Sequence, residues 1–363
     1  MTIHKNIPVY APSITELEKK YVNECLESSW ISSRGPNVDM FEQLFTEKIG
    51  VEYGTTVSNG TVALHLALLS LGIGPGDEVI VPTLTYIAPV NAIKYVGATP
   101  VFVDSLYDSW QMNPEDITRK ITDRTKAILA VHLYGHPCDL DLINKICKDN
   151  NLFLVEDCAE AFGTMFRNKH VGTFGDIATF SFFGNKTITT GEGGMVVSNN
   201  KDLIDICFHL KGQGLAEGKQ YWHDAIGYNY RLTNVACAIG IAQLQRSDYL
   251  INRKLEIASL YREGFYNTGY EFHSEAPNTR HSYWMCSILG SEYKDRDNLM
   301  NYLSANRIET RPVFYPIHTM PMYNTQQSFM VAEDISRRGL NLPSYPDLSD
   351  DEVKYVIEKV LSH

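Results

Sequence analysis

Six short apolar segments alternate with helix-like segments over the first two-thirds of the chain. These segments lack the apolar–polar alternation of strands that have one face in water, and such continuous apolar strands are typical of a sheet covered on both faces. They span residues 77–82, 99–104, 126–135, 151–157, 177–183 and 193–198. Helix-like segments lie between them, for example at 61–71 and 88–96. The alternation predicts a layered α/β domain.

The pattern changes near residues 240–250, where one helical stretch runs from 233 to 265. We therefore expect a large domain over residues 1–245 and a smaller C-terminal α+β domain over 246–363. The second domain contains a strand-like segment at 281–289 and a last helix at 349–361, for which Ser349 is the expected N-cap. A chain of 363 residues is long enough for both domains.

Charge and cysteine usage exclude several classes of protein. The net charge is −11 and the sequence has no long basic run, which argues against a nucleic-acid partner. No apolar stretch approaches the roughly 20 residues of a membrane-spanning helix, and the N-terminus lacks the apolar core of a signal peptide. The seven cysteines are scattered and never spaced C-x-x-C. We therefore expect a reduced, cytoplasmic protein.

One candidate anion site precedes the helix expected at 61–71. Asn59, Gly60 and Thr61 stand directly before its apolar positions. A helix N-terminus offers free backbone N–H groups and a partial positive charge, and a glycine there allows an anion to approach closely. The segment therefore fits a phosphate site, and an ordinary helix cap is the alternative.

Two further candidates are Asp157 and Lys186. Asp157 ends an apolar strand, and ligand sites of open α/β sheets lie beyond the carboxyl ends of strands. A carboxylate there can bind a protonated ring nitrogen, although a solvated or capping role is the alternative. Lys186 follows another strand and precedes a turn rich in threonine and glycine, which projects its side chain from a rigid frame. A plain surface lysine is the alternative.

Two histidines are considered as possible metal ligands. His132 and His136 are four positions apart, a spacing that suits a metal on a helix. Gly135 and Pro137 argue against a helix there. We therefore expect no metal.

The order of these features along the chain resembles the DegT/DnrJ/EryC/StrS sugar aminotransferases, which are fold-type I enzymes dependent on pyridoxal 5'-phosphate (PLP). The segment "GYNYRLTNVACAIGIAQL" at 227–244 is a further part of this pattern. The resemblance extends from "WISSRGPNVDMFEQLF" to "RPVFYPIH" and the last helix, and it implies an aspartate-aminotransferase-like fold with a large mixed-sheet domain. Within the family, "SFFGNKTITTGEGG" is most similar to the perosamine-forming branch, because Phe183-Gly184 stand where other members commonly have His-Pro.

The resemblance implies roles for three residues near the reacting atoms. Lys186 matches the lysine that binds PLP covalently, and Asp157 matches the carboxylate that faces the pyridine nitrogen. Glu160 stands where many members have glutamine, beside the phenolic oxygen of the cofactor. A charged carboxylate beside a phenolate is unfavourable, so we expect Glu160 to hold or share a proton.

The remaining cofactor residues also follow from the resemblance. Ser181 matches the serine that binds the phosphate, together with the backbone of Gly60 and Thr61. Tyr86 matches the aromatic residue stacked on the pyridine ring. Asn229 matches an asparagine that reaches the phosphate from the neighbouring subunit, which implies a homodimer with a shared active site.

The implied reaction is a transamination from L-glutamate to a 4-keto sugar on a nucleotide. A dehydratase branch of the family has histidine in place of the lysine, so Lys186 favours transamination. The resemblance suggests GDP-4-keto-6-deoxy-D-mannose as acceptor and GDP-perosamine as product. A UDP- or dTDP-linked sugar is the first alternative, and a PLP-binding regulator without turnover is the second.

The sequence constrains the residues that contact the substrate less than those that contact the cofactor. Arg311, Tyr315 and His318 cluster in "ETRPVFYPIHTMP" at 309–321. Their side chains suit binding of a sugar or its diphosphate. A structural loop between the two domains is the alternative.

Overall fold

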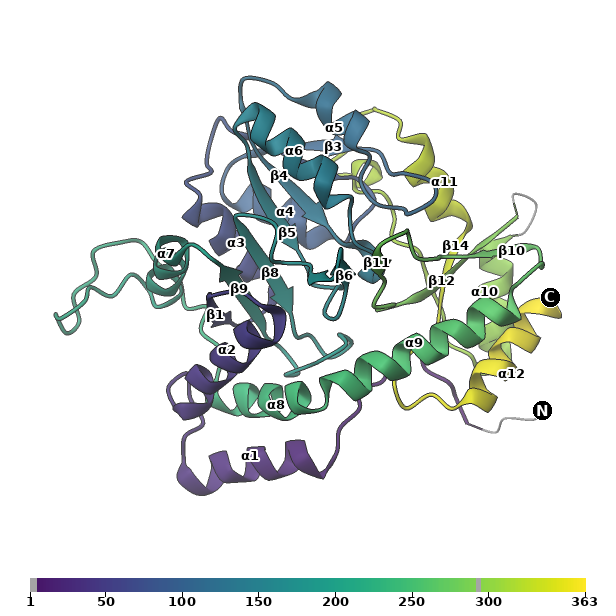
Figure 1. Ribbon diagram of the computed structural model, residues 1–363, viewed down its shortest axis with the longest axis horizontal. Coiled ribbons are helices and arrows are strands. Elements are labelled where there is room, and N and C mark those ends of the chain that lie inside the picture. Colours follow the sequence, from purple (N-terminus) through teal and green to yellow (C-terminus); the bar gives the residue numbers. More distant parts are fainter. Residues whose placement is uncertain (1–4, 292–294) are drawn as a thin grey trace.

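A seven-stranded sheet forms the centre of the computed structural model, which describes residues 5–291 and 295–363 (Figure 1). In spatial order its strands are β1 (Tyr53–Val57), β9 (Gly194–Ser198), β8 (Ile177–Ser181), β5 (Phe153–Asp157), β4 (Thr125–Val131), β2 (Glu78–Pro82) and β3 (Thr99–Val103). The pairs from β8 to β3 are parallel, whereas β9 runs antiparallel to both β1 and β8. The mixed α/β sheet expected from the sequence is confirmed.

Helices cover both faces of this sheet (Figure 1). Alternate residues of one strand enter different cores: Val79 and Val81 join one apolar cluster, and Ile80 joins the other. The first cluster includes residues of α3 (Gly60–Ser70), α4 (Ile87–Tyr95), α7 (Lys201–Lys211) and α11 (Met330–Arg338). The second includes residues of α2 (Pro36–Ile49), α5 (Pro114–Lys120), α6 (Leu140–Asn150) and α8 (Asn234–Gln245). The continuous apolar strands are therefore explained by burial on both sides.

Four elements differ from the sequence expectations. The strand-like segment expected at 281–289 begins only at Cys286, after Tyr283 with φ 48°, and forms β12 (Cys286–Gly290). The strand expected at 126–135 ends at Val131, and a short 3-10 turn follows in which Tyr134 has φ 56°. The extension to 135 is wrong because the Tyr134 N–H turns away from the sheet and donates to Glu160. Strand β1 was not expected, since Gly54, Thr55 and Thr56 interrupt its apolar pattern. The helical stretch at 233–265 is divided at Arg246 into α8 and α9 (Ser247–Gly264).

The C-terminal part builds a second, antiparallel sheet with the order β10–β12–β14–β13. Its strands are β10 (Tyr270–Phe272), β12 (Cys286–Gly290), β14 (Gly339–Leu342) and β13 (Arg311–Pro312). A third apolar cluster joins this sheet to α9, α10 (Arg296–Ala305) and α12 (Asp350–Leu361). The expected division at 245/246 stays a prediction.

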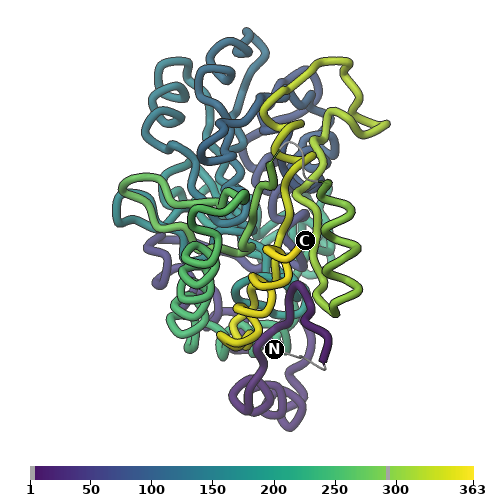
Figure 2. The backbone as a smooth tube through the Cα atoms, turned by 90° about the vertical axis from the view of Figure 1, so that its right-hand side faces the viewer, coloured from purple at the N-terminus to yellow at the C-terminus, as the bar shows by residue number. Residues whose placement is uncertain are grey.

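The N-terminal segment lies against this C-terminal part, as Figure 2 shows for the purple and yellow ends of the chain. Ile7 forms a parallel bridge with Ile308, and Lys5 forms an ion pair with Glu352 at 2.7 Å. Helix α1 (Glu16–Ser28) follows, capped by Thr15. A small sheet of β11 (Thr279–Arg280), β6 (Met165–Phe166) and β7 (Lys169–His170) ties the C-terminal part to the segment after β5.

The fold aligns three strand ends for a site. β8, β5 and β4 are neighbours and parallel, so Ser181, Asp157 and Val131 end at the same edge of the sheet. Ligands of open α/β sheets bind beyond such carboxyl ends. Among the described residues, no helix combines the length and the apolar character needed to cross a membrane.

Candidate active site

Lys186 lies in the loop between β8 and β9, with 13% of its side chain exposed. Its Nζ atom is 3.9 Å from Glu160 Oε1. Burial lowers the pKa of Lys186, and the charges of Glu160 and Asp157 oppose that shift. The structure therefore brings together the lysine and the two acids that the sequence singled out.

Asp157 is the last residue of β5 and is 4% exposed. Its Oδ1 atom accepts the Ala159 N–H at 3.0 Å, and its carbonyl accepts the His132 N–H at 3.1 Å. Burial raises the pKa of Asp157, opposed by the Ala159 amide and by the charge of Lys186. A fixed, buried carboxyl group of this kind suits a cationic partner such as a pyridinium nitrogen.

Glu160 is also buried, at 5% exposure, beside the turn that follows β4. Its Oε2 atom accepts the Tyr134 N–H at 2.7 Å. Burial raises the pKa of Glu160 to about 7, although Lys186 and the Tyr134 amide act in the opposite direction. This raised pKa favours the protonated form of Glu160, and the proton sharing expected beside the cofactor stays a prediction.

A cradle for an anion lies at the start of α3. Asn59 caps the helix, since its Oδ1 atom accepts the Val62 N–H at 3.0 Å. The N–H groups of Gly60 and Thr61 belong to the first turn, so they have no acceptors inside the helix. A Cβ atom on Gly60 would lie 2.8 Å from Ser181 Cβ. Only glycine therefore fits beside Ser181, and the backbone N–H groups and the Ser181 hydroxyl gather at one place. This donor set fits a phosphate group.

Tyr86 precedes α4, and 56% of its surface is exposed. Its ring neighbours Phe314 with 5.7 Å between centroids. An exposed aromatic face of this kind is what stacking on a cofactor ring requires.

Asn229 lies near the end of the segment between α7 and α8, part of which projects from the body (Figure 1), and it precedes Tyr230, whose carbonyl accepts the Ser58 N–H at 2.7 Å. It is exposed, it pairs with Gly212 at the end of α7, and its Oδ1 atom accepts from Arg231 at 3.1 Å. These contacts leave Asn229 on the surface.

The three residues expected to bind substrate differ in how exposed they are. Arg311 is exposed and forms an ion pair with Glu309 at 2.6 Å, and Tyr315 is 53% exposed. His318 is 4% exposed, and its two ring nitrogens lie 2.7 Å from Thr83 Oγ1 and 3.2 Å from Glu333 Oε1. Both ring nitrogens of His318 thus have protein partners, and its expected role in substrate binding stays a prediction.

Two residues that the sequence did not indicate adjoin Lys186. The Trp284 ring centroid is 3.7 Å from Lys186 Nζ, and its indole N–H donates to the Asn185 carbonyl at 2.7 Å. The Tyr10 hydroxyl donates to the Lys186 carbonyl at 2.5 Å. Both residues are distant from Lys186 in the sequence, so no local motif indicates them.

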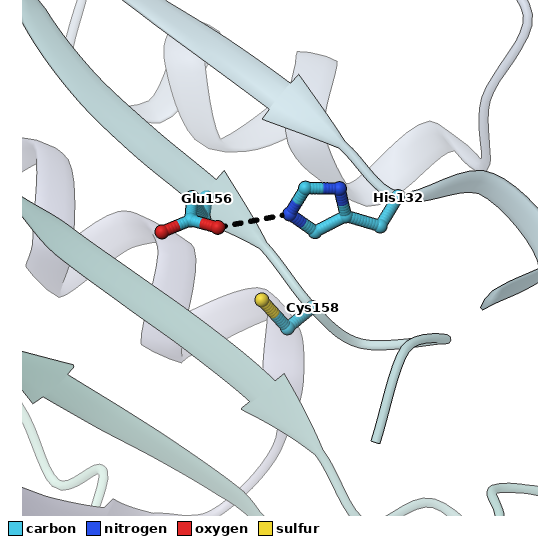
Figure 3. A group of neighbouring side chains, drawn as sticks. All are labelled: His132, Glu156 and Cys158. Carbon is cyan, nitrogen blue, oxygen red and sulfur yellow. Dashed lines mark hydrogen bonds and ion pairs between the residues drawn. The ribbon is translucent and has the colours of Figure 1, made fainter. Parts of the chain in front are cut away.

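A buried group under the site contains His132, Glu156 and Cys158 (Figure 3). Cys138 N–H donates to His132 Nδ1 at 3.1 Å, so Nε2 carries the proton and donates to Glu156 Oε2 at 3.0 Å. Burial raises the pKa of the Cys158 thiol well above its usual range.

Glu156 also accepts three backbone N–H groups, from Gly172, Phe174 and Gly175, at 2.7–2.8 Å. Burial alone would raise the pKa of Glu156, but these bonds and His132 lower it. The lone pairs of His132 and Glu156 are thus engaged, and the group is a hydrogen-bonded support rather than a metal site.

A largely buried lysine near two buried acids and a phosphate cradle at the same sheet edge together define a PLP-dependent enzyme of fold type I. Residues 12–361 match the family model described as the DegT/DnrJ/EryC1/StrS aminotransferase family. The chain belongs to this family.

Curated and solved relatives agree with this assignment. The chain is 61% identical to a GDP-perosamine synthase of Escherichia coli O157:H7 over 98% of both chains. It is 53% identical to a GDP-perosamine synthase of Vibrio cholerae, with coverage of 96% of this chain and 97% of that one. The Streptococcus pneumoniae protein Spr1654, solved in a PLP form, superimposes with a TM-score of 0.94 at 28% identity, covering 98% of each chain. The chain is thus a PLP-dependent aminotransferase.

Proposed function

We propose that this chain transfers the amino group of L-glutamate to C4 of GDP-4-keto-6-deoxy-D-mannose and so forms GDP-perosamine. The observation that carries the proposal is the 61% identity, over 98% of both chains, to a GDP-perosamine synthase. The buried group of Asp157, Glu160 and Lys186 supports it, because these residues supply the acid and base functions of a transamination.

The bound PLP supplies an electron sink, and the protein supplies position and proton transfer. Asp157, held by the Ala159 N–H, would face the ring nitrogen of PLP and favour its protonated form. Lys186 would hold the cofactor. Its amine, when free, would be the base that moves the proton at the α-carbon of glutamate, and its lowered pKa suits that role.

Glu160 and the phosphate cradle complete the site. Glu160, with a pKa of about 7, would donate a hydrogen bond to the phenolic oxygen of PLP when it is protonated. Ser181 and the N–H groups of Gly60 and Thr61 would hold the phosphate, and the exposed ring of Tyr86 would stack on the pyridine. Arg311 and Tyr315, which are exposed, and the buried His318 are the candidates for sugar or diphosphate contacts.

The same proposal includes a homodimer in which Asn229 reaches the phosphate in the partner subunit. The segment between α7 and α8, near whose end Asn229 lies, exposes large apolar side chains, which favour burial against another chain. Among them Tyr221 is 86% exposed, Trp222 53% and Ile226 90%. A cytoplasmic location is supported by the seven cysteines, which are free and buried.

A competition assay tests the substrate. Purified protein receives L-glutamate and equal amounts of GDP-, UDP- and dTDP-linked 4-keto-6-deoxy sugars, and mass spectrometry follows the aminated products. We expect the GDP-linked sugar to be aminated first. Preferential amination of the UDP- or dTDP-linked sugar contradicts the GDP assignment, and PLP binding without any response to glutamate contradicts the aminotransferase.

A further inference from the structure

Trp284 closes one side of the space around the Lys186 amine. Its ring centroid lies 3.7 Å from Lys186 Nζ, and Glu160 Oε1 lies 3.9 Å from the same atom. Trp284 is 4% exposed and directly precedes β12, so it comes from the C-terminal part of the chain. The amine therefore lies between a carboxyl group from one part of the fold and an indole face from the other.

The Trp284 ring is held in place by its surroundings. Its indole N–H donates to the Asn185 carbonyl at 2.7 Å, next to the lysine itself. The Tyr134 ring stacks on it with 6.0 Å between centroids and an angle of 19°. The Trp284 carbonyl accepts from the buried Lys254 Nζ at 3.2 Å. Two contacts thus hold the ring and a third holds the backbone of Trp284, so the ring presents a constant face to the amine.

The geometry points to Trp284 as a positioning residue that holds the ε-ammonium group of Lys186 whenever this amine is not bonded to the cofactor. The role rests on the proposed function, in which Lys186 is displaced and later returns. The negative face of an indole attracts a cation, most strongly where water is excluded. Trp284 therefore favours the ammonium form, whereas burial favours the neutral amine, and the balance decides how readily Lys186 gives up and takes back a proton.

The test measures the Lys186 amine directly, in the full chain freed of PLP; an apo form of the Streptococcus pneumoniae relative has been solved. Trinitrobenzenesulfonate reacts with neutral amines, and peptide mass spectrometry gives the rate at Lys186 across a pH series. At neutral pH we expect Trp284→Leu to raise that rate roughly 3- to 10-fold, because less of the amine is protonated. Well above the pKa of the amine, the variant and the wild type should react at the same limiting rate.

The shape of the pH profile separates this role from a purely structural one. A rate raised by the same factor at every pH means that the smaller side chain only opened access, and this result overturns the inference, as does an unchanged profile. Trp284→Phe keeps an aromatic face, so it should give an intermediate rate and replaces the leucine variant if that protein does not fold.

The matched control is Phe265→Leu. Phe265 is 2% exposed and packs against Tyr261 and Tyr270 in the third apolar cluster, so its removal leaves a cavity away from Lys186. It should leave the Lys186 profile unchanged, and an equal change in both variants overturns the role of Trp284. Failure of the proposed function is recognised separately, as wild-type protein that binds no PLP or does not respond to glutamate.

Discussion

Glu160 Oε1 and Lys186 Nζ lie 3.9 Å apart in a buried space, and the opposite oxygen of Glu160 is fixed by the Tyr134 N–H at 2.7 Å. The carboxyl group thus has a pKa of about 7, although a charged lysine lies beside it. Desolvation of the Glu160 carboxyl group therefore raises its pKa more than the attraction of Lys186 lowers it. The pair contains a proton that the two side chains can share at neutral pH.

Stability should fall as pH rises through the pKa of Glu160. The folded-state pKa of Glu160, about 7, exceeds the ordinary value of 4.5. The contribution of this group to stability is therefore fully present below pH 4.5 and is lost as pH rises through about 7. Glu160→Gln cannot titrate. Between pH 4.5 and about 7, the free energy of unfolding of the wild type should therefore fall relative to that of Glu160→Gln. Denaturant titrations of both proteins without PLP measure this difference. Glu115→Gln, at an exposed position, is the control, and a constant wild-type-to-Gln difference would contradict the assignment.

Lys186→Ala should abolish the absorbance band of the lysine-bound cofactor and leave that of the free aldehyde, because the covalent bond to the cofactor is lost. Turnover should fall by roughly 10²–10⁴-fold or more, since the proton carrier is also gone. Absorbance spectra and a coupled assay for 2-oxoglutarate measure the two effects. Lys94→Ala changes an exposed lysine of α4 and should alter neither. A Lys186→Ala protein that keeps the band would exclude Lys186 as the cofactor lysine.

Asp157→Asn should separate cofactor binding from catalysis. Lys186 remains, so the visible band should persist, but the neutral amide no longer holds the ring nitrogen protonated. We expect kcat to fall by about 10²–10³-fold, the usual loss when one preorganised electrostatic contact is removed. Asp123→Asn, in an exposed turn, is the control. Activity within a few-fold of the wild type would show that Asp157 does not act on the ring.

The layered fold could be predicted because its signal is local. Strands such as Glu78–Pro82 are buried at every position, so their composition alone indicates two covered faces. Strand β1 was missed for the opposite reason: its glycine and threonines are polar or small, and its burial depends on pairing with β9. The strand expected to reach 135 failed because a tertiary contact, from Tyr134 to Glu160, ends it.

The residues of the candidate site also fall into those that the local sequence indicates and those that only tertiary packing brings to the site. Asp157 and Lys186 stand at strand ends and in a glycine-rich turn, where residue type and position already indicate chemistry. Trp284 and Tyr10 reach Lys186 only through packing of the C-terminal sheet and the N-terminal segment, which no local pattern specifies. His318 suits substrate binding by composition, yet its environment commits both nitrogens to the protein.

Glu156→Gln should destabilise the fold without any metal being involved. An amide has one acceptor oxygen, so at least one N–H group that now donates to Glu156 loses its partner, at a cost of about 1–3 kcal/mol. The pKa of Glu156 is lowered below 4.5, so its contribution is present above pH 4.5 and is lost as pH falls. Denaturant titrations should therefore show a difference at neutral pH that shrinks in acid.

Exposed Glu24→Gln is the control for Glu156→Gln. Zinc or a chelator should leave the wild-type unfolding midpoint unchanged, and a zinc-dependent rise would show that the group of His132, Glu156 and Cys158 binds metal.

Gly60→Ala should weaken PLP binding, because the new Cβ atom would lie 2.8 Å from Ser181 Cβ and push apart the two sides of the phosphate cradle. Overpacking of this kind costs about 1–3 kcal/mol, equivalent to a Kd for PLP raised roughly 5- to 150-fold. Gly74→Ala is the matched control, since its nearest neighbour would be the Val96 carbonyl oxygen at 3.8 Å. Fluorescence titration with PLP compares the two, and equal affinities would place the phosphate elsewhere. Adding Ser181→Gly to Gly60→Ala removes the clash but also the hydroxyl, so affinity recovered in the double variant would measure how much of the loss is steric.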